Sequence, residues 1–456
     1  MKKYSLSLHV FRRDLRLVDN TALIAALESS EQVLPCFIMD ERQINNNDYK
    51  SSAAINFMAN SLLELDQELR KQNGRLFIFR GIAEEVISSL LGKYPVEAVF
   101  VNRDYTPFSR SRDQRIKQVC EKHEVDLNVH ADALLTEPEE VHKPNGQPYT
   151  IFTHFYKKAL SCSVAPVRKN HYKNYYQAKI EIENEKTLES LLHPGDNFAV
   201  TGGRIEGLRL LQNIRRLVDY NNLRNYPAKE GTTRLSAHNK FGTISIREFY
   251  AAILEQLSKD NALIKELYWR DFFTHISYHF PKVFGQAFQD KYNNIAWDND
   301  QEKFIAWCEG LTGFPIVDAG MRELNSTGYM HNRLRMITAS FLVKNLHIDW
   351  RWGEKYFAQK LVDYDPAVNN GNWQWAASTG CDAQPYFRVF NSWLQQEKYD
   401  PDCVYIKHFL PELSGLDPRQ IHGLRSASLE LRHYPHPIVD HASSAQAIRQ
   451  VFKSQK

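Results

Sequence analysis

A segment at residues 363–380 gathers the residue types that could bind a polar aromatic ligand. Its sequence, DYDPAVNNGNWQWAASTG, combines two aspartates, three asparagines and two tryptophans. Carboxylates accept hydrogen bonds, amides both donate and accept them, and indole rings offer flat surfaces for stacking. The same composition is also typical of an Asx-rich turn that caps a helix beginning near Trp373. From the residues alone, a ligand pocket and a helix cap are equally good interpretations.

A second segment, GTTRLS at residues 231–236, contains the groups needed to hold a pyrophosphate. Three hydroxyl side chains and an arginine follow a glycine. Hydroxyls, backbone N–H groups and a guanidinium all donate hydrogen bonds to phosphate oxygens. In isolation, however, a Ser/Thr cap at the start of a helix is the favoured interpretation.

Two further segments carry polar and aromatic side chains at helical spacing. In ELYWR, Glu266 and Trp269 are three residues apart, and in MHNRLRM, Asn332 and Met336 are four apart. These spacings place each pair on one face of a helix. Such a face could receive a ligand, although the residues alone favour an ordinary half-buried helix face.

The composition bounds the class of protein. Of the 456 residues, 43% are hydrophobic, which is enough for two or three domains, and no run of about eighteen apolar residues is present. The N-terminus does not resemble a signal peptide, so we expect a soluble cytoplasmic protein without membrane contact. Six cysteines lie far apart without a CxxC pair, so neither a disulfide framework nor a metal site is expected. The net charge of +3 decides nothing about nucleic acid, because binding requires only a local basic patch.

The first 135 residues alternate apolar runs with amphipathic stretches. The pattern predicts strands at 4–11, 33–39, 75–79, 98–102 and 127–130, and helices at about 20–29, 51–72, 82–92 and 108–122. Strand–helix alternation is typical of an α/β, Rossmann-like parallel sheet, which binds ligands beyond the carboxyl ends of its strands. The GxGxxG pattern is absent, so a dinucleotide bound in that mode is not predicted. Asp19 or Asn20 is expected to cap the first helix.

The rest of the chain divides into a connector and a helical domain. Residues 136–202 lose regular periodicity and become basic and rich in tyrosine towards 160–200, which favours a solvated interdomain linker over a nucleic-acid contact. From 203 to 456 the pattern is helical almost throughout. Helices are predicted at about 208–217, 246–258, 262–280, 301–310, 314–326, 330–346 and 351–361.

Together these segments resemble the DNA photolyase and cryptochrome family, and most closely its class I photolyases, which repair cyclobutane pyrimidine dimers. Residues 363–380 resemble the flavin-binding signature, and 231–236 resemble the phosphate loop for flavin adenine dinucleotide (FAD). FRRDLRLVDNTAL at 11–23 resembles the opening signature, with Val10 where a tryptophan is common. The resemblance implies a Rossmann-like domain at 1–135 and an all-helical FAD-binding catalytic domain at 203–456. It also implies a monomer that binds DNA containing pyrimidine dimers.

For the flavin, the resemblance implies contacts from residues of several segments. These are Tyr220, Thr232, Thr233, Arg234, Leu235, Ser236, Asp363, Asp365 and Asn369. Asn369 matches the position beside the reactive ring nitrogen. An amide there can bond the ring in both redox states, which favours repair over the signalling of plant-type cryptochromes. Arg335 is expected to pair with Asp363 and to support an anionic ring.

For the DNA, the resemblance implies a pocket that receives a flipped-out dimer. Its residues would be Glu266, Trp269, Asn332, Arg333 and Met336, with Trp375 facing the dimer and Arg224, Arg270 and Gln395 contacting the strand. Glu266 would stabilise the dimer radical anion. A (6-4) photolyase tends to carry paired histidines here, whereas this chain has His331 alone, which is expected to be a packing residue. Tyr329 stands where relatives often have tryptophan.

The resemblance also concerns electron transfer and light harvesting. Trp297, Trp350 and Trp373 match a tryptophan relay to the flavin, although spacing alone would make them core residues. Folate-using relatives carry an Asn–Glu pair where this chain has Phe108 and Ser109. This difference argues against a folate antenna and leaves a deazaflavin, or no second chromophore.

Two alternatives to light-dependent repair follow from the same residues. A cryptochrome-like blue-light photoreceptor would bind the same cofactor but signal through a partner. A flavoprotein electron carrier would lack a basic surface around the pocket. The dimer-pocket residues and Asn369 favour repair.

Overall fold

The computed structural model describes residues 2–45, 47–180, 182, 198–425 and 433–455. Its N-terminal part contains a five-stranded parallel sheet with the order β3-β2-β1-β4-β5. The strands are β1 (Tyr4–Phe11), β2 (Ser30–Met39), β3 (Phe77–Arg80), β4 (Ala98–Asn102) and β5 (Asp126–His130). In the central register, Val10 of β1 lies between Cys36 and Val101. The α/β prediction is therefore confirmed, and the predicted strands match these within three residues.

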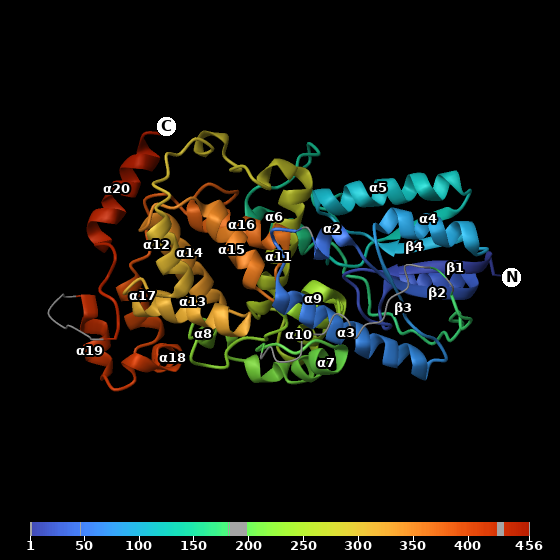
Figure 1. The fold of residues 1–456 in the computed structure, drawn as a ribbon, viewed down its shortest axis with the longest axis horizontal. Helices are drawn as coiled ribbons and strands as arrows, with labels where there is room; N and C mark the ends of the chain where they lie inside the picture. Colours follow the sequence, from blue (N-terminus) through green and yellow to red (C-terminus); the bar gives the residue numbers. More distant parts are fainter. Residues whose placement is uncertain (1, 46, 181, 183–197, 426–432, 456) are drawn as a thin grey trace.

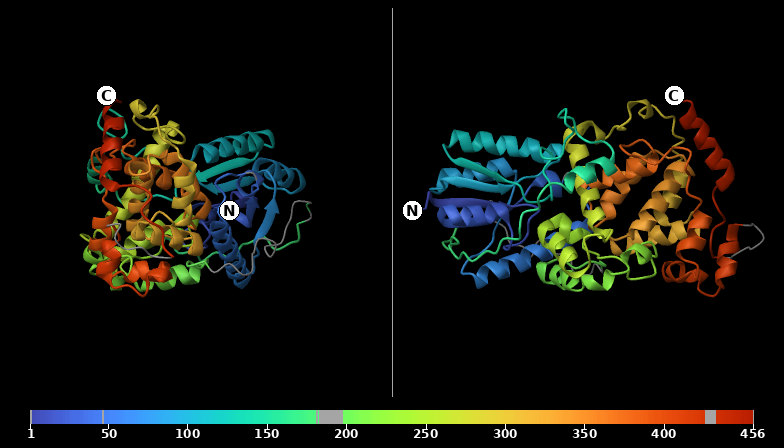
Figure 2. Two further views of the ribbon diagram at one scale, coloured as in Figure 1. Left: turned by 60° about the vertical axis from the view of Figure 1, so that its left-hand side comes forward. Right: turned by 180° about the vertical axis from the view of Figure 1, so that it is seen from behind.

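Helices cover both faces of this sheet (Figures 1 and 2). They are α1 (Thr21–Ser29), α3 (Ser52–Lys71), α4 (Ala83–Lys93) and α5 (Pro107–Lys122), whereas the short α2 (Glu41–Ile44) follows the end of β2. Leu6, Leu8 and Val10 of β1 face the core formed with α4 and α5, while α1 and α3 pack on the other side. As expected, Asn20 caps α1 by accepting the Leu23 N–H at 3.1 Å. The short α2 was not predicted.

The C-terminal part is helical, as predicted, and lies beside the sheet along the long axis of the molecule (Figure 2). Its helices are α7 (Arg204–Gln212), α8 (Tyr220–Leu223), α9 (Ser236–Phe241), α10 (Ile246–Gln256), α11 (Leu263–His279), α12 (Gln301–Glu309), α13 (Pro315–Thr327), α14 (Asn332–Lys344), α15 (Trp350–Lys360), α16 (Pro366–Ala377), α17 (Ser392–Tyr399), α18 (Val404–Phe409), α19 (Pro418–His422) and α20 (His441–Lys453). None of the helices in the described ranges has the length and apolar character needed to cross a lipid bilayer.

The region expected to be a solvated linker is partly packed into the fold. Helix α6 (Phe152–Ala159) contributes Phe152 and Phe155 to the core that contains α11. Further on, Tyr175 is 2% exposed and forms a parallel bridge with Val33 at the start of β2. The expectation of a solvated connector is thus wrong for these residues, because their aromatic side chains are buried. Residues 181 and 183–197 lie outside the described part.

Helix α16 begins earlier than the tryptophan pattern suggested. Asp365 caps it by accepting the N–H groups of Ala367 and Val368 at 3.0 and 3.2 Å, and Pro366 is its first residue. The start near Trp373 is therefore wrong. Residues 370–372, which a cap for a helix beginning near Trp373 would place in a turn, lie within α16 instead.

A buried network of charges joins the sheet to the helical part. Arg16 binds both carboxylate oxygens of Asp132 at 2.8 and 2.7 Å. Arg247 of α10 donates to Asp132 at 2.9 Å and to Asp19 at 2.9 Å. All four side chains are at most 9% exposed. Since buried charges are stable only when paired, this network fixes how the two parts meet.

Candidate functional site

A cavity of about 300 Å³ lies in the helical part. Its wall is formed by the loop before α9, by α11 and α14, and by residues 363–376. Most of the predicted site residues meet here, namely Tyr220, Thr232, Thr233, Arg234, Leu235, Ser236, Glu266, Arg270, Asn332, Arg335, Met336, Asp363, Asp365, Asn369, Trp373 and Trp375. Segments more than one hundred residues apart in the chain therefore form one site.

The loop at 231–236 is held in an unusual backbone conformation. Arg234 has a φ of 55°, in the left-handed region that a non-glycine residue occupies at a cost of about 1–2 kcal/mol. The Thr233 hydroxyl accepts the Leu235 N–H at 3.2 Å and closes the loop. The Arg234 guanidinium lies 5.6 Å from the ring centroid of Tyr329. This loop therefore presents hydroxyls and a cation towards the cavity.

The predicted pair of Arg335 and Asp363 is present. The two guanidinium nitrogens of Arg335, on α14, donate to the two carboxylate oxygens of Asp363 at 3.0 and 2.8 Å. Tyr329 packs against this guanidinium at 5.7 Å, so it keeps an aromatic wall where relatives often have tryptophan. A two-pronged bond of this kind fixes both side chains.

Asp365 connects the cavity to the sheet. Besides capping α16, it pairs with Arg13, which follows β1. Burial alone would raise the pKa of Asp365, but the charges of Arg13 and Lys240 lower it well below its usual range, so the carboxylate is ionised. Burial, assisted by Arg13, lowers the pKa of Lys240 to about 8. The charges at the rim of the cavity therefore come from residues of both the sheet part and the helical part.

Asn369 is held so that its amide oxygen is available to a ligand. It is 9% exposed, and its Nδ2 donates to the backbone carbonyl of Glu354 at 3.1 Å. Within the described residues, no donor reaches its Oδ1. The neighbouring Asn370 donates to the Glu354 carboxyl at 2.9 Å, and burial raises the pKa of Glu354 to about 7.

Glu266, Asn332 and Met336 lie in the cavity wall beside the loop residues. Glu266 pairs with Arg224 at the end of α8. Burial raises the pKa of Glu266, and the Arg224 guanidinium opposes that rise. Asn332 Nδ2 lies 3.9 Å from the Met336 sulfur, so these two side chains form one surface, as their spacing predicted.

Several residues predicted for DNA occupy other positions. Trp269 is not in the cavity wall, because its ring stacks on Phe152 with centroids 3.6 Å apart and an angle of 8°. Arg270 does line the cavity, but it is bound to the Ala133 carbonyl at 2.6 Å. Arg333 donates to Asn225 at 2.6 Å and lies over a tyrosine ring of α17. Arg224, Arg333 and Gln395 also lie outside the cavity wall.

The outer members of the predicted relay also lie away from the cavity. Trp350 is fully buried, and Trp297 contacts the ring of Phe452 on α20 at 6.1 Å. In both indoles, the buried ring nitrogen has no hydrogen-bond partner. Only Trp373, 2% exposed, reaches the cavity wall.

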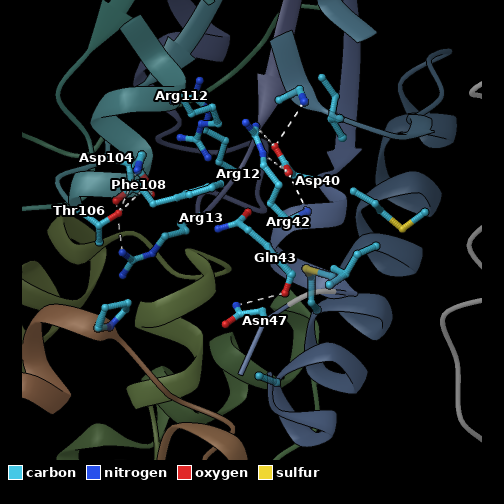
Figure 3. A pocket seen from close by; sticks show the side chains of 18 of the residues that line it. Arg12, Arg13, Asp40, Arg42, Gln43, Asn47, Asp104, Thr106, Phe108 and Arg112 are labelled. Atoms are coloured by element: carbon cyan, nitrogen blue, oxygen red, sulfur yellow. Dashed lines mark hydrogen bonds and ion pairs between the residues drawn. The ribbon is translucent and has the colours of Figure 1, made fainter. Parts of the chain in front are cut away.

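A second cavity of about 530 Å³ opens at the carboxyl ends of β1 and β2, where the sheet rule places ligands (Figure 3). Arg12 and Arg42 line it together with Phe108, at the start of α5. Arg42 is bound to Asp40 and Glu84, and its guanidinium lies 5.3 Å from the Phe108 ring centroid. The second cavity therefore combines fixed cations with an aromatic surface.

The two cavities share part of their walls. Lys240 and Tyr364 border both of them, and Arg13 lies beside both through Asp365. These three residues were missed by the sequence interpretation. Lys240 follows the loop at 231–236 by four residues, so extending that motif into α9 would have found it. The contact of Arg13 with Asp365 joins positions too distant for any local pattern to reveal.

The sequence of this chain is similar to those of known proteins over nearly its whole length. The model of the family described as DNA photolyase matches residues 7–171, and that of the FAD binding domain of DNA photolyase matches 263–454. The chain is 36% identical to a deoxyribodipyrimidine photo-lyase of Alkalihalophilus pseudofirmus, covering 97% of each chain. It is also 36% identical to that of Escherichia coli, covering 94% of this chain and 95% of the other.

Solved structures show the same likeness over the whole length. An archaeal photolyase of Sulfolobus tokodaii, solved with two FAD molecules, has a TM-score of 0.88 and 45% identity, covering 98% of this chain and all of its own. A class III photolyase of Agrobacterium tumefaciens has a TM-score of 0.91 and 34% identity, with 100% and 98% covered. A Synechocystis cryptochrome has a TM-score of 0.90 and 30% identity, with 99% and 100% covered.

Proposed function

Because the chain belongs to the DNA photolyase family, we propose that it is a deoxyribodipyrimidine photo-lyase that repairs cyclobutane pyrimidine dimers in DNA under light. One observation carries this proposal. Glu266, Asn332 and Met336 line the same cavity as the FAD-loop residues 232–236. A cofactor and a flipped-out dimer would therefore share one cavity.

The residues of the central cavity fit FAD. The loop at 231–236, in which Arg234 has a left-handed backbone conformation, offers hydroxyls and a cation. Asp363 is paired with Arg335, and Asn369 keeps its Oδ1 available to a ligand. We propose that the loop holds the pyrophosphate and that Asn369 contacts the ring. When bound and reduced, FAD supplies an electron under light, which opens the cyclobutane ring and then returns.

The residues beside the cofactor would bind and orient the dimer. Asn332 and Met336 offer an amide and a polarisable thioether on one surface, and Trp375 adds a ring to the same wall. Glu266 would bond the dimer and stabilise the charge that develops on it. Arg224, paired with Glu266, acts as a positioning residue and also gives the rim a cation for phosphate.

The proposed repair is tested with protein whose FAD has been reduced chemically. Illumination with an oligonucleotide that contains one thymine dimer is expected to restore the thymines, and a dark sample should not. A cryptochrome-like photoreceptor, favoured by the likeness to the Synechocystis protein, would bind FAD but restore none. That result would replace the repair proposal with the photoreceptor.

Glu266→Gln tests the role of the carboxyl group. We expect a several-fold lower yield of repaired dimers per absorbed photon, because the amide of glutamine cannot stabilise the charge on the dimer as the carboxyl group does. FAD should stay bound. Glu302→Gln changes an exposed glutamate of α12 and is the matched control. Equal repair yields in the two variants would remove Glu266 from the mechanism.

We further propose that the second cavity holds an antenna chromophore of the flavin class. The Sulfolobus tokodaii relative was solved with two FAD molecules, which imply a novel light-harvesting cofactor in that protein. Here, Arg12 and Arg42 supply cations for phosphate, and the Phe108 ring supplies a stacking surface. Acid extraction followed by chromatography should then yield two flavin equivalents per chain, or FAD and a deazaflavin. A single flavin equivalent per chain that does not increase after incubation with FAD or a deazaflavin would contradict this proposal.

A further inference from the structure

The ring contacts of Trp373 lead towards α12 and not along the predicted relay. Its ring centroid lies 6.2 Å from that of Trp307, at an interplanar angle of 73°. Phe357 bridges the same two rings, at 4.9 Å from Trp373 and 5.9 Å from Trp307. Among the rings of the described residues, no contact joins Trp350 to Trp373 or to Trp297. Trp307 is therefore an indole in direct ring contact with Trp373.

One hydrogen bond of Trp307 favours its oxidised form. The ring is fully buried, and its Nε1–H donates to the backbone carbonyl of Thr338 at 3.1 Å. A hydrogen bond to a carbonyl stabilises the positive charge of an oxidised indole, because it favours the charged form of the donor. The buried ring nitrogens of Trp350 and Trp297 lack such a partner. Of these three indoles, Trp307 is therefore the one whose hydrogen bond offsets part of the desolvation cost of a positive charge.

Tyr356 connects Trp307 to the surface. Its ring centroid lies 5.7 Å from that of Trp307. Its hydroxyl donates to the Asn325 amide oxygen at 2.6 Å and to the Cys308 carbonyl at 3.1 Å. Asn325 is exposed, so the phenolic proton has a short path to water. A phenol that can release its proton gives up an electron far more readily than one that cannot.

We propose that Trp307 and Tyr356 form a second electron route to Trp373, used when light reduces the bound flavin. The inference rests on the proposed function. Oxidised Trp373 takes an electron from Trp307, and oxidised Trp307 takes one from Tyr356. Tyr356 loses its hydroxyl proton to water beside Asn325 and becomes a neutral tyrosyl radical. A thiol in solution donates a hydrogen atom to this radical, which restores the phenol.

Paramagnetic resonance of the illuminated holoprotein, with oxidised FAD bound and no thiol present, tests this route. The parent should show a tyrosyl radical, and Tyr356→Phe should abolish that signal. This variant keeps the ring and removes only the hydroxyl, so it leaves the packing intact. A tyrosyl signal that survives in Tyr356→Phe would overturn the assignment of Tyr356.

Flavin absorbance under light with a thiol present tests Trp307 itself. Trp350→Phe should retain photoreduction, whereas Trp307→Phe with Trp350→Phe should lose it. Trp393→Phe is the matched control, because this buried tryptophan of the same core contacts only the Phe314 ring among the described rings. Complete loss in Trp350→Phe alone would overturn the second route.

Two measurements keep these outcomes apart from other failures. If Trp307→Phe does not retain FAD, the tyrosyl signal of the parent and of Tyr356→Phe decides the question. Repair by the chemically reduced parent requires no relay, so its absence would reject the proposed function while leaving the radical measurements valid.

Discussion

Arg335 and Asp363 show how single side chains serve both the fold and the site. The Asp363 side chain is only 4% exposed, and its charge is balanced by both guanidinium nitrogens of Arg335. A buried carboxylate that loses its counterion is strongly destabilising. The pair therefore contributes to stability before any ligand binds.

Arg335→Met is expected to lower the free energy of unfolding of the FAD-free protein by about 3 kcal/mol, because Asp363 is left unpaired. The free energy of unfolding of Arg335→Lys should lie between those of the parent and of Arg335→Met, since an ammonium cannot reproduce the two-pronged bond. Urea denaturation measures both. Arg209→Met removes an exposed pair on α7 and should cost less than about 1 kcal/mol. If the two methionine variants cost the same, the buried pair has no special role.

Gly371 permits the close crossing of α16 and α11. A Cβ at this position would overlap the ring of Phe273. Helix propensity alone would favour Gly371→Ala by about 1 kcal/mol, but overpacking costs about 1–3 kcal/mol, so we expect net destabilisation. Gly415→Ala, where nothing lies near the added atom, serves as the comparison in thermal melts. A melting temperature that rises at residue 371 would contradict the packing.

Individual elements were predicted well where the pattern was periodic. Strands β1 and β4 match their predicted bounds, and the helices predicted between 246 and 361 match within two residues. The tryptophan pattern places the start of α16 too late, whereas Asp365–Pro366 is a sequence that favours a cap and a first helical residue. Tyr175 was missed because a single buried ring leaves no periodic signal.

The site was predicted only as far as motifs extend. Residues within the two FAD segments lie together in the structure, whereas Trp269 stacks on Phe152 of α6. That contact depends on where an unpredicted helix packs. Spacing gives the face of one helix, but it does not give the partner that covers this face.

Helix α20 contacts a buried lysine of α14. Lys344 of α14 is fully buried, donates to the Ser378 hydroxyl at 3.0 Å and lies 3.9 Å from the ring centroid of Phe452. Burial lowers the pKa of Lys344 to about 7 from its usual 10.5. The ammonium therefore costs stability wherever the folded protein must hold it charged.

A lowered lysine pKa penalises the folded state most at low pH. The penalty is full below about pH 7 and disappears as pH rises to about 10.5, where the unfolded chain also loses the proton. The stability of the parent relative to Lys344→Met should therefore increase across this interval. Denaturant midpoints of both proteins measure the difference, with the partly exposed Lys303→Met as control. A constant difference would show that Lys344 stays charged or reaches water.

On the scale of the whole molecule, the sheet and the helical part are joined by buried charges. Arg247 enters from α10 and binds Asp19 and Asp132, which follow strands of the sheet. Asp365 and Arg13 form a second link near the cavities. Both links are electrostatic, so the relative placement of the two parts depends on charges that solvent does not screen.

Arg247→Met should weaken this union. It leaves two carboxylates without one partner, and we expect a loss of about 3–5 kcal/mol. Unfolding followed by fluorescence and by circular dichroism should then separate into two transitions, because the parts lose their mutual support. Arg70→Met, in an exposed pair on α3, should leave a single transition. Coincident transitions in Arg247→Met would show that apolar contacts alone hold the parts together.

The wall shared by the two cavities also constrains how this molecule can change over generations. A substitution at Lys240 or Tyr364 changes both cavities at once, since each residue borders both. Phe108 and Arg42 border the second cavity only. Substitutions on the far side, as at Phe108, can therefore change the second cavity alone, whereas substitutions in the shared wall change both.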